Sequence, residues 1–234
     1  MDDFTLIGKT HVGNMHAENQ DRITKRKLDS QLANREVYII GVADGISQCS
    51  FGGSVARWII EKHLAVDPVF EVTGKPLATQ FENYLRELYG IFQDEFSDFE
   101  DMLSSGATLS AAIAAGPHAD CFWAGDSPIY YSELINDGYL TKRISKPDID
   151  TSGLLTDCFG AHAEFRLKHN SVEMRTGSVL TITSDGAALD ADLLSHLYNT
   201  LGFDEAVNEE VMSLSLAGQY ADDVSFVAIC RNNA

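Results

Sequence analysis

The chain has few basic residues and no long apolar run, and each shortage excludes a class of protein. Lys and Arg number 17 against 35 Asp and Glu, which gives a formal net charge of −18 at pH 7. Nucleic-acid affinity rests on Lys and Arg that displace counterions from phosphates, so we expect no nucleic-acid partner. The longest apolar runs, such as 37–43, are far shorter than the ~20 residues that cross a bilayer. We therefore expect no membrane span.

Cysteines are also scarce. The four cysteines form no CxxC pair, and no His stands at zinc-finger spacing. Three lie in or beside apolar stretches, where a free thiol behaves as a small hydrophobic side chain, so we expect reduced thiols. The acidic N-terminus, MDDFTLIG, lacks the basic and apolar regions of a secretory signal, and the expected location is the cytoplasm. P-loop and GxGxxG signatures are missing too, which disfavours a nucleotide-binding α/β protein.

The pattern that is present combines many short apolar strands with amphipathic helices. The expected strands are 4–13, 21–28, 37–43, 107–115, 120–125, 129–134, 139–144, 179–184 and 223–230. The expected helices are 55–65, capped by Ser54, then 76–96, opened by Pro76, and 190–201 and 204–216. The polar segment 146–160 is expected to be a surface loop. This pattern favours layered sheets covered by helices, in a single domain over residues 1–234.

Aspartates recur where these strands meet loops. Asp44, Asp126 and Asp185 each follow a strand, Asp222 precedes the last strand, and Asp21 begins the second. Asp is common in turns because it bonds nearby backbone N–H groups, and for any single residue this structural explanation is the stronger. For five residues it weakens, because strand ends can converge and converging carboxylates repel unless cations neutralise them. Oxygen ligands without His or Cys clusters favour magnesium or manganese, which indicates a two-metal hydrolase.

Seven short segments follow one another in a distinctive order. They are N-x-x-x-E-N-Q-D ending at Asp21, VADGISQCSFGGSVA, SGATLSAAI, FWAGDSPIYY, DCFG, TSDGAALD and ADDVSFVAI. In this order they resemble the motifs of the PP2C (PPM) family of metal-dependent serine/threonine protein phosphatases, over nearly the whole chain. Each motif alone occurs by chance in many chains, whereas seven in the right order with suitable spacing are specific.

The resemblance implies an α+β fold, a PP2C-like four-layer α/β/β/α sandwich with two central, mostly antiparallel sheets flanked by helices. It implies a phosphoprotein phosphatase that hydrolyses phosphoserine and phosphothreonine with metal-activated water at a dinuclear Mn²⁺ or Mg²⁺ centre. The expected partners are a phosphorylated protein substrate and a cognate Ser/Thr kinase or its target. The small size is typical of a bacterial minimal catalytic domain, with specificity expected in the loop 146–159 or in a partner.

The resemblance also implies roles for individual residues. The catalytic metal ligands would be Asp21, Asp44, Asp185 and Asp222 with the Gly45 carbonyl, and Asp44 would bridge the two ions. Asp126 would help to hold a third, weaker ion, and Asp223 would support the neighbouring ligand.

Departures from the family pattern leave an alternative open. His16 stands where the first motif usually carries a phosphate-binding Arg, whose bidentate fork a His lacks. A phosphate-binding role and an incidental loop His are interpretations of equal weight. Ile46 replaces a His that serves some members as general acid, and Pro128 replaces the Arg usual after G-D-S. The alternative is a catalytically weak or inactive PP2C-like binding or regulatory module.

Overall fold

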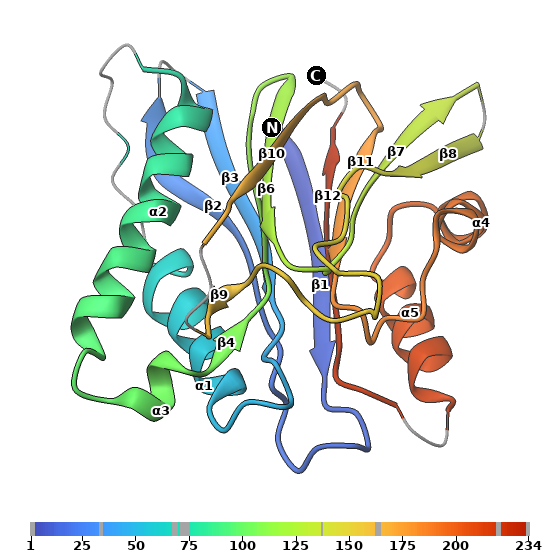
Figure 1. The fold of residues 1–234 in the computed structure, drawn as a ribbon. Helices are drawn as coiled ribbons and strands as arrows, with labels where there is room; N and C mark the ends of the chain where they lie inside the picture. The colour runs from blue at the N-terminus through green and yellow to red at the C-terminus, as the bar shows by residue number, and fades with distance from the viewer. Residues whose placement is uncertain are drawn as a thin grey trace.

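The structure is a computed structural model that describes residues 3–32, 35–66, 70, 75–136, 138–161, 165–218 and 221–232, with the backbone alone for 29–32 and 35. Two five-stranded antiparallel sheets face each other at the centre, and helices cover both outer faces (Figure 1). This is the predicted α+β fold with four layers in the order α/β/β/α.

The first sheet has the order β1 (Phe4–His11), β12 (Val224–Arg231), β11 (Val179–Thr183), β7 (Ile129–Ile135) and β8 (Gly138–Arg143). The second has the order β10 (Lys168–Glu173), β6 (His118–Ala124), β5 (Leu109–Ala115), β3 (Arg35–Ala43) and β2 (Arg22–Leu32). The short strands β4 (Gly106–Ala107) and β9 (Phe159–Gly160) pair with each other. The helices are α1 (Gly52–Arg57), continued by the π-helix η1 (Trp58–Leu64), then α2 (Leu77–Glu95), α3 (Glu100–Leu103), α4 (Ala191–Leu201) and α5 (Ala206–Leu216).

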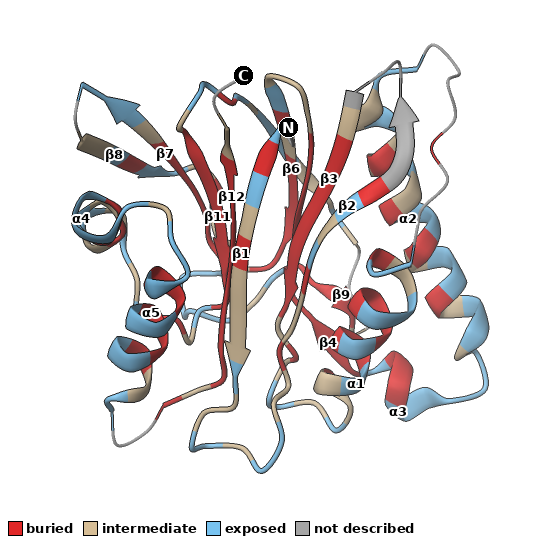
Figure 2. Ribbon diagram, turned by 180° about the vertical axis from the view of Figure 1, so that it is seen from behind, coloured by how far each residue is buried: buried red, intermediate tan, exposed pale blue. Residues whose placement is uncertain are grey.

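The central strands carry continuous apolar runs because both of their faces are buried (Figure 2). In β3, Ile39 packs in the layer under α1 and α2, whereas Ile40 packs between the sheets. In β12, Phe226 packs under α4 and α5, and Val227 packs between the sheets. Successive side chains of a strand point to opposite faces, so a strand with an apolar layer on each side needs no polar alternation.

Helix α2 covers the second sheet with one apolar face. Its buried residues are Phe81, Leu85, Leu88 and Phe92, which recur at helical spacing. Pro76 occupies the N-cap position, in agreement with its predicted place at the start of this helix. At the other side of the molecule, the Asp190 side chain caps α4 by accepting the N–H of Leu193 at 2.8 Å.

One prediction about local structure is wrong, and one strand was missed. Ser54 does not cap the first helix, because α1 already begins at Gly52 and the Ser54 N–H donates to the Phe51 carbonyl at 2.9 Å. The close packing of Gly52 and Gly53 against other backbone segments sets this earlier start. The strand β10 was not predicted, since KHNSVE lacks apolar alternation; it forms through backbone pairing with β6 at the sheet edge.

The cysteines agree with the sequence analysis. All four are free thiols, and Cys121, Cys158 and Cys230 are buried. None of the helices in the described part of the chain is both long and apolar enough to cross a membrane.

Candidate metal centre

Most of the predicted acids line one pocket at one edge of the sandwich. Strands β3, β6 and β11 finish at this edge, and β12 starts there. It has a volume of about 240 Å³ and is lined by Asp44, Gly45, Ile46, Ser47, Gln48, Thr108, Asp126, Leu155, Asp185 and Asp222. The tertiary structure therefore brings together four carboxylates that are far apart in sequence. Among these lining residues there is no Lys, Arg or His.

Asp44 directly follows β3, and Thr108 fixes its backbone. The Asp44 N–H donates to the Thr108 hydroxyl at 3.2 Å, and the Thr108 N–H donates to the Asp44 carbonyl at 2.8 Å. The Thr108 hydroxyl also lies 2.6 Å from the hydroxyl of Ser127. Because Thr108 and Ser127 are buried, these bonds fix the direction in which Asp44 leaves the sheet. Sequence analysis assigned no role to Thr108, although it stands in the SGATLSAAI motif.

Gly45 lies against the beginning of α1. A Cβ at this position would lie 2.5 Å from the carbonyl carbon of Gly52 and from the nitrogen of Gly53. On its other side Gly45 pairs with Ala107 in an isolated β-bridge. Only glycine fits between these backbones, and the fit holds the Gly45 backbone at the pocket wall.

Asp21 lies beside the pocket at the start of β2 and is 1% exposed. Burial raises the pKa of its carboxyl to about 6, although the nearby hydroxyls of Ser184 and Ser225 lower it. Those hydroxyls lie outside normal hydrogen-bonding geometry, so both carboxylate oxygens lack a partner among the described residues. A buried carboxylate without donors is unfavourable unless a proton or a cation neutralises it.

The carboxyls of Asp44 and Asp126 also have raised pKa values. Burial raises the pKa of Asp44 well above its usual value, and the charges of Asp21 and Asp185 raise it further. Burial, and then the charge of Asp185, raises the pKa of Asp126. The charge of Arg143 lowers the pKa of Asp126 in part. One guanidinium N–H of Arg143 donates to the Asp126 backbone carbonyl at 2.8 Å. These carboxyls lie close enough to repel one another, a condition that a divalent cation relieves.

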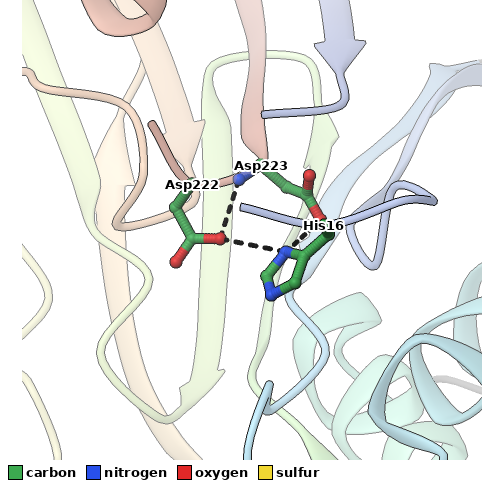
Figure 3. Close-up of side chains that lie close together, drawn as sticks. All are labelled: His16, Asp222 and Asp223. Carbon is green, nitrogen blue, oxygen red and sulfur yellow. Dashed lines mark hydrogen bonds and ion pairs between the residues drawn. The ribbon is translucent and has the colours of Figure 1, made fainter. Parts of the chain in front are cut away.

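His16 does not line this pocket, but it contacts one of the pocket's acids (Figure 3). Its Nδ1 lies 3.4 Å from Asp222 Oδ1 and 3.2 Å from Asp223 Oδ2. The His16 side chain is 17% exposed, so it is not an incidental solvent-facing loop residue. Its predicted contact with a substrate phosphate stays a prediction.

The donor set fits hard divalent cations. Four aspartates line the pocket, and magnesium and manganese prefer oxygen ligands of this kind. The unpartnered oxygens of Asp21 provide independent support, because they are buried acceptors without a donor. Leu155, from the loop after β8, also lines the pocket, and sequence analysis did not single it out. Its apolar side chain in an otherwise polar segment was the available signal.

Solved structures of phosphatases share this fold. The serine/threonine phosphatase PstP of Mycobacterium tuberculosis aligns with a TM-score of 0.79 and 18% identity, covering 98% of this chain and 99% of that one. Stp1 of Staphylococcus aureus aligns with a TM-score of 0.79 and 14% identity, covering 100% of this chain and 96% of that one. PppA of Pseudomonas aeruginosa aligns with a TM-score of 0.71 and 22% identity over 97% of each chain. Comparison with curated protein sequences finds no match.

The two-sheet sandwich is the fold that these structures share with the chain. The sequence profile of protein phosphatase 2C matches residues 7–220. The chain therefore belongs to the protein phosphatase 2C family, and its enzyme class is that of the protein-serine/threonine phosphatases.

Proposed function

We propose that the chain removes phosphate from phosphoserine and phosphothreonine residues of proteins at a dinuclear Mn²⁺ or Mg²⁺ centre. The observation that carries the proposal is the gathering of Asp44, Asp126, Asp185 and Asp222 in one pocket that no basic side chain lines. The raised pKa values of Asp44 and of the adjacent Asp21 add to it. The similar PstP has been solved in complex with two manganese ions, which supports the same stoichiometry here.

The residues that would hold the two ions are Asp21, Asp44, Asp185, Asp222 and the Gly45 carbonyl. Asp126 would hold a third ion more weakly, since Arg143 already neutralises part of its charge. The partner would be a phosphorylated protein, supplied by a cognate Ser/Thr kinase.

When bound, divalent cations lower the pKa of water and neutralise charge on a phosphoryl oxygen. The chain supplies the geometry: Thr108 and Gly45 hold the backbone around Asp44 rigid. Ser47 and Gln48 line the pocket and carry neutral hydrogen-bond donors for phosphoryl oxygens. Ile46 has no proton to give, so it cannot protonate the leaving alkoxide.

The alternative of a non-catalytic binding module is not favoured. A module without metal ions would have no reason to keep Asp21 buried without hydrogen-bond donors or to hold Asp44 beside like charges. Retaining such a cluster lowers stability unless cations bind it.

The proposal is tested with purified protein on p-nitrophenyl phosphate and on a phosphothreonine peptide, with manganese and then with EDTA. We expect turnover of both substrates with manganese and its loss with EDTA. Asp44→Asn should lower kcat by about 1,000-fold, because the variant would lose a ligand of the cations whose charge stabilises the transition state.

Asp98→Asn is the matched control, because Asp98 is an exposed residue outside the pocket. It should retain full activity. Absence of metal-dependent turnover in the wild-type protein, or an Asp44→Asn variant with most of its activity, would contradict the proposal.

A further inference from the structure

The loop between β1 and β2 is hydrogen-bonded to the residues that precede β12. A Cβ on Gly13 would lie 2.2 Å from the Ala221 carbonyl oxygen and 2.3 Å from that of Asp222. The Asn14 N–H donates to the Ala221 carbonyl at 2.9 Å, and the Asn14 side-chain oxygen accepts the Ala221 N–H at 2.9 Å. The two segments therefore form one unit, although more than 200 residues separate them.

The Asp223 side chain accepts backbone hydrogen bonds from both ends of this loop. Its side chain is 2% exposed, and its Oδ1 accepts the Gly13 N–H at 2.8 Å. Its Oδ2 accepts the Gln20 N–H at 2.7 Å, directly before Asp21. Asp223 is therefore occupied by backbone donors, and it holds His16, which lies between these two points in the loop, against Asp222.

The Nδ1 atom of His16 is a hydrogen-bond donor. Both of its neighbours, Asp222 Oδ1 and Asp223 Oδ2, belong to carboxylates, which only accept (Figure 3). The His16 ring also lines a separate cavity of about 450 Å³ with Gln20 and Gly53 rather than the acidic pocket. His16 therefore contacts Asp222 and Asp223 but does not line the acidic pocket.

These contacts fix one oxygen of Asp222. Oδ1 accepts the Asp223 N–H at 2.8 Å and lies 3.4 Å from His16 Nδ1. Oδ2 receives no hydrogen bond from any residue that the structure describes, and Asp222 lines the acidic pocket. His16 Nδ1 hydrogen-bonds Asp223 Oδ2 and lies at ion-pair distance from Asp222 Oδ1. The Asp223 N–H and the adjacent His16 imidazole therefore hold the Asp222 carboxylate through Oδ1 and leave Oδ2 for a ligand in the pocket.

We propose that His16 is a positioning residue that orients Asp222 for a divalent cation and does not contact the substrate phosphate. This inference rests on the proposed function, since it presumes that Asp222 is a metal ligand. Removal of such an outer hydrogen-bond partner weakens metal binding by about 10- to 100-fold.

The test measures manganese affinity by isothermal titration calorimetry, without substrate, for the wild type, His16→Ala, His16→Asn and Asp222→Asn. We expect His16→Ala to bind manganese about ten-fold more weakly. His16→Asn should recover most of the affinity, because its amide nitrogen takes the place of Nδ1. His11→Ala is the matched control and should bind as the wild type does, since His11 Nδ1 bonds only the neighbouring Val12 carbonyl.

The enzymatic counterpart separates positioning from phosphate binding. At saturating manganese, His16→Ala should leave the KM for the phosphothreonine peptide unchanged. Unaltered manganese affinity in His16→Ala together with a raised KM would overturn the inference and assign His16 to the phosphate. Unaltered affinity in Asp222→Asn would instead overturn the proposed metal centre, so the two failures are distinguishable.

Discussion

At the scale of the residue, Asp21 is the least exposed of the predicted carboxylate ligands. It is buried and lacks hydrogen-bond donors, and its pKa is raised to about 6 from 3.8. A carboxyl whose pKa is raised in the folded state stabilises the fold below the pKa of the unfolded state. That stability is lost as the pH rises through the folded-state pKa. In the metal-free protein, ionised Asp21 therefore opposes folding at neutral pH.

Asp21→Asn should consequently stabilise the metal-free protein at pH 8, by about 2 kcal/mol, since each pKa unit corresponds to about 1.4 kcal/mol and part of the shift depends on Asp44. At pH 4 the gain should disappear, because Asp21 is then protonated in the folded state. Urea unfolding in EDTA at both pH values measures the difference. An equal effect at pH 4 and pH 8 would show that the charge is not the cause.

At the scale of the element, the loop 146–160 is fastened near the pocket by one lysine. Lys168 of β10 lies 2.9 Å from Asp148 and 2.7 Å from Asp157, near the two ends of the loop. Asp148 also accepts the N–H of Gly125, which precedes Asp126, at 3.0 Å. These bonds hold Leu155 at the pocket wall. That specificity depends on this loop or on a partner stays a prediction.

Lys168→Met should loosen this loop, because it leaves Asp148 and Asp157 without their shared cation. We expect the Thr156 amide, which donates to the Asp148 carbonyl at 2.8 Å, to exchange hydrogen about five-fold faster, as a loss of about 1 kcal/mol implies. Hydrogen exchange followed by mass spectrometry measures it. Lys142→Met, on the exposed strand β8, is the control and should leave the loop unchanged. Unchanged exchange in Lys168→Met would mean that the loop is held by other contacts.

At the scale of the whole molecule, the fold concentrates part of the acidic charge in one pocket. The formal net charge is −18, and the sandwich brings several of its carboxylates into one pocket. Protons and divalent cations compete for these oxygens, since metal ligands must be deprotonated. Binding to the folded state alone raises stability by mass action.

Manganese should therefore raise the Tm more at pH 8 than at pH 5. At pH 5 Asp21, with a pKa of about 6, is mostly protonated in the metal-free protein, whereas at pH 8 it is ionised and binds the cation. In EDTA the Tm should fall from pH 5 to pH 8 for the same reason. Thermal unfolding with and without manganese across this pH range checks both trends. If the increase in Tm caused by manganese is independent of pH, the buried acids are not metal ligands.

The local patterns predicted much of the fold. The apolar runs 37–43 and 223–230 predicted strands, which β3 and β12 confirm. Pro76 marked the start of α2 correctly. The polar strand β10 and the early start of α1 were not predictable, because pairing with β6 and packing around Gly52 are long-range contacts without a local signal. That residues 1–234 form one domain and act in the cytoplasm stays a prediction.

By itself the sequence determined which acids stand at strand ends and the order of motifs that defines the family. Only the tertiary structure decided how these residues meet. The sequence left His16 with two interpretations of equal weight, and the structure places it beside Asp222 in a loop whose Gly13 N–H is bound by Asp223, 210 residues away. Asp21 was one acid among several, and the structure alone shows it buried without donors. Periodicity is a local property, whereas convergence and desolvation depend on how distant strands pack.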